Sequence, residues 1–200
     1  MSRPFMGDGK IVTGANAISA FRFWCAVMAF AAILRLSPVE ALIWGLIGVF
    51  SDLFDGKVAK RGWLGGASNL GKILDPIADK IMILLPLVGI GSALFILGYS
   101  KEAWFVLAAA AIVAVREIVI WRTKKKLFEL EGIQSAIESA RASMVMQSAG
   151  FIGMLFAWAF MQIDLVMFCA GVVPSASLVA AWDYVKRLSR LRRERELALV

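Results

Sequence analysis

This 200-residue chain contains no histidine and only two cysteines. Without histidine the chain cannot use a serine–histidine triad, a histidine-based zinc site or phosphohistidine chemistry. Cys25 and Cys169 each lie inside an apolar run, which favours small packed residues over a disulfide. Any catalysis must therefore use carboxylates, Lys, Arg, Ser or bound metal ions.

Charged residues are also scarce. They make up 18% of the chain, hydrophobic residues make up 60%, and the mean hydropathy is +0.76. A soluble domain is about a quarter charged and about half apolar. The composition predicts a single integral membrane catalytic domain over residues 1–200, with no nucleic-acid partner. The net charge of +7 is typical of a membrane protein whose basic loops face anionic membrane lipids.

The apolar segments predict an all-α, polytopic protein with six transmembrane helices. Most segments are close to the roughly 20 residues that a spanning helix needs. The second is too short unless its helix continues through Asp52 and Asp55 to about Lys57. The six segments are Ala17–Leu34, Val39–Phe50, Ile73–Gly98, Ala103–Trp121, Met144–Met161 and Leu165–Tyr184.

The positions of the Lys and Arg residues predict how these spans are oriented. Six spans place both termini on one side of the membrane, and of the 22 Lys and Arg residues only Arg35 and Lys101 fall on the other. This bias predicts cytoplasmic termini in a bacterial inner membrane or its equivalent. The longest polar connection, 122–142, predicts a surface helix at the membrane. The basic tail, 185–200, is either a solvated topology signal or a segment lying on lipid headgroups.

Four aspartates are concentrated in the motif region 51–80. Asp52 and Asp55 are three residues apart and Asp75 and Asp79 are four apart, so each pair shares one face of a helix. Two such helices side by side would gather four anions, whose repulsion needs neutralising. Carboxylates without His or Cys suit hard ions such as Mg²⁺ or Mn²⁺, and two carboxylate-held ions are common in phosphoryl transfer.

The same carboxylates would also fit a cation carrier. A carrier more often places polar residues on several helices near mid-bilayer and shows inverted internal symmetry. Here the charges cluster at one face of the membrane, which favours an interfacial enzyme. Glycines crowd the connection between the two aspartate pairs, and a glycine backbone can approach a nucleotide pyrophosphate closely. Lys60 or Arg61 would then lie against the pyrophosphate oxygens.

This region resembles the CDP-alcohol phosphotransferase family. The family signature is D-x2-D-G-x2-A-R, a spacer, and then G-x3-D-x3-D. It is matched by "DLFDGKVAK", which begins at Asp52, and by "GKILDPIAD", which ends at Asp79. Two features depart from the signature. Lys60 stands in place of its arginine, with Arg61 next to it, and the spacer is slightly longer than usual.

The resemblance implies a metal-dependent membrane enzyme of six helices, usually dimeric, with its active site open to the cytoplasm. Asp52, Asp55 and Asp75 would ligate the ions, and Asp79 would complete the metal site and act as general base. An acceptor alcohol would attack the β-phosphate of a CDP-linked lipid, and CMP would leave. The residues that would contact the CDP group in this region are Gly56, Ala59, Lys60, Arg61 and Gly71.

Within the family, "LDPIADKIM" looks most like the phosphatidylglycerophosphate synthase branch. Asn16, Ser19 and Arg22 resemble the N-x2-[ST]-x2-R pattern of that branch's first helix and would turn to the nucleotide. Arg116, followed by Glu117, resembles an Arg-Glu pair of the branch's fourth helix. Arg116 would either bind the acceptor phosphate or be neutralised by Glu117 or a nearby aspartate.

Arg141 aligns with the first lysine of the branch's G-K-x-K-T segment and is a second candidate for the acceptor phosphate. The second lysine and the threonine of that segment are missing. The resemblance implies transfer of a phosphatidyl group from CDP-diacylglycerol to glycerol 3-phosphate. The same chemistry with phosphatidylglycerol, inositol phosphate or serine as the acceptor stays open.

Overall fold

The computed structural model describes residues 14–59, 71–131 and 138–198, and all regular structure in these ranges is α-helical. This agrees with the predicted all-α class. The six helices in these ranges are α1 (Gly14–Leu34), α2 (Pro38–Ala59), α3 (Gly71–Ile96), α4 (Ser100–Glu131), α5 (Glu138–Ala159) and α6 (Ile163–Ala198).

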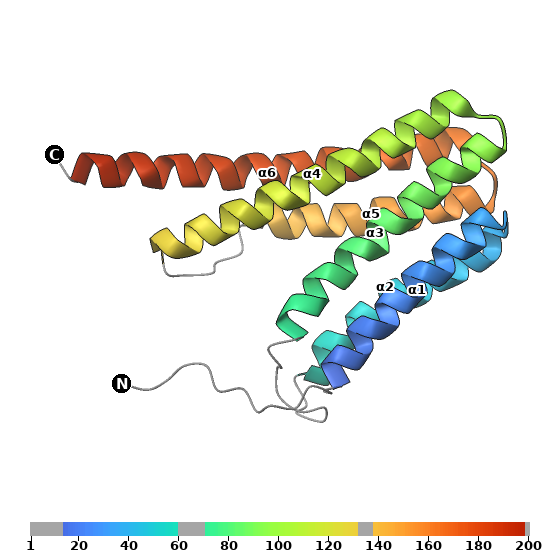
Figure 1. Ribbon diagram of the computed structural model, residues 1–200, viewed down its shortest axis with the longest axis horizontal. Coiled ribbons are helices and arrows are strands. Elements are labelled where there is room, and N and C mark those ends of the chain that lie inside the picture. Colours follow the sequence, from blue (N-terminus) through green and yellow to red (C-terminus); the bar gives the residue numbers. More distant parts are fainter. Residues whose placement is uncertain (1–13, 60–70, 132–137, 199–200) are drawn as a thin grey trace.

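Three tight turns join the helices in antiparallel pairs at one end of the bundle (Figure 1). Each turn has one residue with positive φ just after a helix: Leu36, Gly98 or Met161. In each turn this residue donates to a carbonyl three residues back, and the next residue donates to one five back. This pattern closes a helix by satisfying its last carbonyls. The opposite end of the bundle therefore holds the C-terminus of α2 and the N-terminus of α3.

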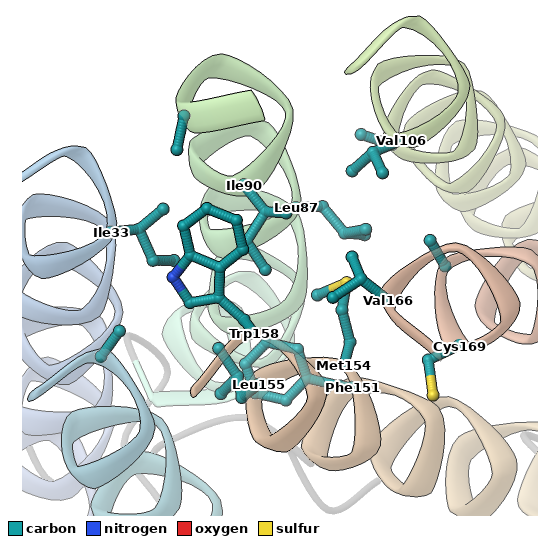
Figure 2. Close-up of a cluster of buried hydrophobic side chains, with 14 of the residues drawn as sticks. Ile33, Leu87, Ile90, Val106, Phe151, Met154, Leu155, Trp158, Val166 and Cys169 are labelled. Carbon is teal, nitrogen blue, oxygen red and sulfur yellow. The ribbon is translucent and has the colours of Figure 1, made fainter. Parts of the chain in front are cut away.

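The first three helices pack together, since α1 lies against both α2 and α3. In the second half, α6 packs against α4 and α5, while α4 also contacts α3 and α5 also contacts α2. Trp158, Phe151 and Leu155 of α5 fill the space between the two halves, near Ile33 of α1 and Leu87 of α3 (Figure 2). Because lipid is as apolar as these side chains, the close fit of the helices contributes more than removal from water.

Four helices contain a stretch long and apolar enough to cross a membrane: Ala17–Leu34, Ile77–Ile96, Ser100–Thr123 and Ile163–Leu191. Their outer faces expose large apolar side chains, as a lipid-facing surface requires. The chain is therefore a helical integral membrane protein. The apolar parts of α2 and α5 are shorter, at Pro38–Ser51 and Val145–Ala159. The predicted continuation of α2 beyond its apolar part is confirmed, because the helix runs on to Ala59.

The two longest helices continue well past their apolar stretches. The predicted helix within the polar segment 122–142 is observed as far as Glu131, but it continues α4 without a break instead of forming a separate surface helix, and α5 begins at Glu138. The basic tail likewise continues α6 as far as Ala198. Leu188 and Leu191 of this tail pack near Ile120 and Tyr184 in a small second cluster. Leu188 and Leu191 therefore contact the protein itself, whereas Val185 at the start of the tail is exposed.

Candidate active site

Gly48, near the middle of α2, faces side chains of both α1 and α3. A Cβ atom at Gly48 would lie 2.3 Å from Met82 Cε of α3 and 3.2 Å from Cys25 Cβ of α1. A side chain here would displace the end of Met82 and crowd Cys25. The absence of one at Gly48 therefore leaves room for the Met82 side chain of α3 to reach α2, beside α1, which packs against both helices.

By their helical register, the four aspartates share the faces of α2 and α3 on which Gly48 and Met82 lie. In α2, Asp52 and Asp55 follow Gly48 by four and seven positions. In α3, Asp79 and Asp75 precede Met82 by three and seven positions. In an α-helix these spacings keep residues on one face. Both pairs therefore lie one and two turns beyond the contact, at the same end of the bundle (Figure 1).

Asp79 is paired with Arg22 of α1, the helix between the two aspartate helices. The Arg22 Nη1 donates to Asp79 Oδ1. The arginine side chain is 3% exposed and the aspartate side chain is 56% exposed. A buried guanidinium is costly without a counter-charge, so the pair ties α1 to α3. The aspartate still offers half its surface to a ligand. Ser19, one turn before Arg22, is fully buried.

Other predicted site residues are described less fully. Lys60 and Arg61 lie outside the described residues. Several others have a described helical backbone but no described side chain: Asn16, Asp52, Asp55, Gly56, Ala59, Gly71, Asp75 and Arg141. Among the described side chains, no three acidic residues or cysteines form a group that could hold a metal ion. Three of the four aspartates are not in that set.

The donor types and their register suit a hard divalent cation. Carboxylates are the only strong anionic ligands that the faces of α2 and α3 bring to this end, and oxygen donors of this kind hold Mg²⁺ or Mn²⁺. Asp79 also keeps an accessible carboxylate despite its pairing with Arg22. These residues therefore fit the ions that the sequence predicts.

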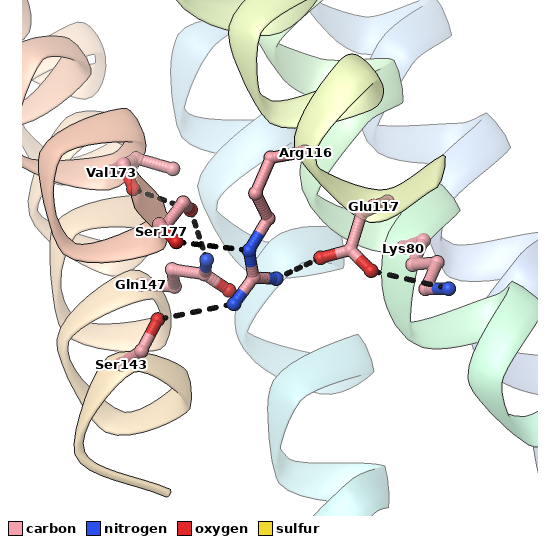
Figure 3. A network of polar contacts seen from close by, with 7 residues as sticks. All are labelled: Lys80, Arg116, Glu117, Ser143, Gln147, Val173 and Ser177. Carbon is pink, nitrogen blue, oxygen red and sulfur yellow. Dashed lines mark hydrogen bonds and ion pairs between the residues drawn. The ribbon is translucent and has the colours of Figure 1, made fainter. Parts of the chain in front are cut away.

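A second polar group surrounds Arg116, which is 7% exposed in the middle of α4. Its Nε donates to the carbonyl oxygen of Ser177 in α6 at 3.1 Å. Its Nη1 pairs with Glu117, and its Nη2 donates to Ser143 Oγ of α5 at 3.4 Å (Figure 3). Groups from three helices therefore hold the guanidinium. Of the two arrangements left open by the sequence, neutralisation by Glu117 is observed directly.

Gln147 of α5 and Ser177 of α6 extend this group. The Gln147 Nε2 donates to Ser177 Oγ, which itself donates to the carbonyl of Val173 at 2.8 Å (Figure 3). All three residues are buried. Hydrogen bonds in such a low-dielectric setting fix side chains strongly when they are satisfied. The arrangement holds α5 and α6 in register beside Arg116.

Glu117 connects the two polar groups through α3. Its Oε2 lies 3.1 Å from the Nζ of Lys80, the residue that follows Asp79 (Figure 3). Lys80 therefore turns to α4, whereas Asp79 turns to α1. Carboxylates that can hold cations and an arginine that can hold an anion thus lie on connected helices, an arrangement suited to a phosphate ester.

Sequence reasoning missed several members of this network. Ser143, Gln147 and Ser177 were not predicted, and Lys80 had no assigned role beyond its charge. The available signal was weak: single polar residues within apolar helices that are costly unless paired. Their spacing along the chain does not say which of them meet.

Comparison with known proteins gives a family match. The model of the CDP-alcohol phosphatidyltransferase family matches residues 12–180. A Mycoplasma genitalium protein named CDP-diacylglycerol–glycerol-3-phosphate 3-phosphatidyltransferase is 31% identical over 137 residues, which cover 67% of this chain and 53% of the relative. An Escherichia coli protein of the same name is 25% identical over 170 residues, or 84% of this chain and 87% of the relative. No solved structure matches the chain.

Proposed function

The chain belongs to the CDP-alcohol phosphatidyltransferase family, a family of transferases, and we propose that it transfers a phosphatidyl group from CDP-diacylglycerol to glycerol 3-phosphate. The observation that carries this proposal is the register of the four aspartates with Gly48 of α2 and Met82 of α3, whose side chain reaches Gly48, because it puts both aspartate pairs at one end of the bundle beside α1. The names of the relatives support glycerol 3-phosphate as the acceptor.

In this reaction Asp79 is the general base. Its half-exposed carboxylate accepts the proton of the acceptor hydroxyl, whose oxygen forms a bond to the β-phosphorus of the CDP-linked lipid. The bond from that phosphorus to the oxygen of the CMP phosphate breaks, and CMP leaves. Arg22 holds Asp79 at the bundle end, because its buried guanidinium cannot move away without leaving a charge uncompensated.

Asp52, Asp55, Asp75 and Asp79 would hold two divalent ions, Mg²⁺ or Mn²⁺. Such ions neutralise the pyrophosphate and stabilise the charge on the leaving phosphate. The residues proposed to bind the CDP group, listed from α1 onward, are Asn16, Ser19, Arg22, Gly56, Ala59, Lys60, Arg61 and Gly71.

Arg116 and Arg141 would bind the phosphate of the acceptor. Arg116 can serve because its three contacts with described residues use only three of its five N–H groups. The second candidate function is the same chemistry with another acceptor alcohol. Two observations favour it over glycerol 3-phosphate: Arg116 is already paired with Glu117, and the segment after Arg141 has the neutral Ser143.

We further propose that all six helices cross the membrane. Helices α2 and α5 have 22 residues each, about 33 Å at 1.5 Å per residue, which exceeds the roughly 30 Å hydrocarbon core. Trp121 and Trp182 are 63% and 70% exposed where the apolar surfaces of α4 and α6 give way to basic residues. Exposed tryptophans favour the headgroup level at either face. The basic residues beyond these two favour the anionic cytoplasmic leaflet, so this end would face the cytoplasm. A homodimer is the expected assembly.

An acceptor panel tests the proposal. The purified chain is incubated with CDP-diacylglycerol and Mg²⁺ or Mn²⁺, together with glycerol 3-phosphate, phosphatidylglycerol, inositol phosphate or serine, and CMP release is followed. We expect CMP release with glycerol 3-phosphate. Release with a different acceptor only would correct the substrate, and no release with any acceptor would remove the proposed activity.

A further inference from the structure

Glu117 pairs with two cations at once. Its Oε1 accepts from Arg116 Nη1 in its own helix, and its Oε2 lies 3.1 Å from Lys80 Nζ in α3. Its side chain is only 16% exposed, so the pair with buried Arg116 is largely shielded from solvent and the pair with Lys80 is partially exposed. A single carboxylate thus joins the helix that carries Asp79 to the arginine proposed for the acceptor (Figure 3).

We propose that Glu117 is a positioning residue of the transfer reaction, which holds the Arg116 guanidinium in the orientation that binds the acceptor's phosphate group. The inference rests on the proposed function for the identity of the acceptor. Its geometric basis is independent: the other two groups that Arg116 contacts, the Ser177 carbonyl and the Ser143 hydroxyl, are neutral. Among the residues that the structure describes in this network, only Glu117 supplies Arg116 with a counter-charge.

A carboxylate next to an anion site has two opposing effects. It repels a phosphate, but it also keeps the buried guanidinium in place. Lys80 reduces the repulsion, because it neutralises the second oxygen of Glu117 and leaves the three groups with a net positive charge. At 7% exposure, an arginine without its counter-ion would turn towards water or other acceptors. We therefore expect the positioning effect to exceed the repulsion.

The test measures binding and turnover on the full-length chain in detergent. Inorganic phosphate is titrated by thermal shift, and KM is measured for glycerol 3-phosphate and for CDP-diacylglycerol. In Glu117→Gln we expect the half-saturating phosphate concentration and the acceptor KM to rise about 10-fold or more, with the KM for CDP-diacylglycerol changed less than about twofold. Glu117→Asp keeps the charge, so its values should lie between those of the wild type and Glu117→Gln.

Two further variants complete the test. Glu40→Gln breaks the exposed Arg35–Glu40 pair, a matched contact of 2.9 Å at the end of the bundle that carries the three turns. It should change neither the half-saturating phosphate concentration nor the acceptor KM. Lys80→Gln removes the partially exposed partner of Glu117, and should raise the half-saturating phosphate concentration about two- to fivefold while keeping the fold. If Glu117→Gln does not fold, the phosphate titration of Lys80→Gln tests the role of Glu117 in its place.

Several outcomes would overturn the inference. One is a wild type that does not respond to phosphate. Another is unchanged or tighter phosphate binding in the Glu117 and Lys80 variants, which would make Glu117 a mere competitor of the anion. A third is a loss of turnover with both KM values unchanged, which is the signature of a purely structural role. If the wild type releases no CMP with any acceptor, the proposed function fails, while the phosphate titration still decides the role of Glu117.

Discussion

Asp79 of α3 forms an ion pair with Arg22 of α1, two residues that are 57 positions apart in the sequence. The arginine is buried and the carboxylate is half exposed, so the fixed charge is inside and the accessible charge is at the ligand side. This asymmetry suits a base that must keep its place and still reach a substrate. It also explains why an arginine can lie so deep in the first helix.

Replacement of Asp79 by asparagine should abolish turnover without unfolding the chain. The amide oxygen can still accept a hydrogen bond from Arg22, so the contact between α1 and α3 persists in part. The amide cannot accept the proton of the acceptor hydroxyl, and loss of a general base typically costs about 10²- to 10⁴-fold in rate. CMP release and thermal unfolding in detergent measure the two effects.

Asp164→Asn is the matched control for this substitution, because Asp164 lies in the first turn of α6 at the end of the bundle that carries the three turns. It should leave CMP release unchanged. Retained turnover in Asp79→Asn would remove Asp79 from the role of base.

Gly89 of α3 allows the close approach of α1, and its replacement by alanine should destabilise the bundle. A Cβ atom there would lie 2.9 Å from Phe30 Cδ2 and 3.4 Å from Ile33 Cγ2. The aromatic ring must move, and overpacking of this kind typically costs about 1–3 kcal/mol. The melting temperature in detergent should fall.

Gly171→Ala is the comparison for Gly89→Ala. Its Cβ atom would make one ordinary contact, 3.6 Å from Phe105 Cζ. Alanine also favours a helix over glycine by about 1 kcal/mol, so the melting temperature should stay or rise. Equal effects of the two substitutions would contradict the tight packing of α1 on α3.

The arrangement of helices was more predictable than their contacts. The apolar runs predicted that α2 continues beyond its apolar stretch, because the second run is too short to span a membrane unless its helix continues through Asp52 and Asp55. The extent of α4 was not predictable, since the polar residues after Trp121 could equally belong to a surface helix. The structure shows one helix that runs on to Glu131.

The candidate site was predictable where the sequence carries a dense motif. The aspartates stand out because charge is rare in this chain. Glu117 was one of the predicted partners of Arg116. The partner of Arg22 and the other partners of Arg116 were not predictable, because contacts between distant residues depend on which helices pack together. Ser143 and Ser177 look like ordinary small residues of apolar helices until the structure places them beside a guanidinium.

The proposed orientation predicts opposite labelling of the two ends of the bundle. In a chain carrying Cys25→Ala and Cys169→Ala, the exposed positions Lys101 and Arg193 are changed to cysteine one at a time. A membrane-impermeant maleimide added to intact cells should label Lys101→Cys and spare Arg193→Cys until the cells are opened. The reverse pattern would invert the topology, and labelling of both in intact cells would contradict a single orientation.

The central claim, that aspartates of α2 and α3 jointly hold divalent ions, is tested most directly by counting bound Mn²⁺. Electron paramagnetic resonance would follow a Mn²⁺ titration of the purified wild type, Asp52→Asn and Asp75→Asn, each with CDP-diacylglycerol present. We predict two Mn²⁺ per wild-type chain, and fewer ions or binding weakened about 10-fold or more in each variant. A wild type that binds no Mn²⁺, or a variant of either helix that binds it unchanged, would contradict the claim.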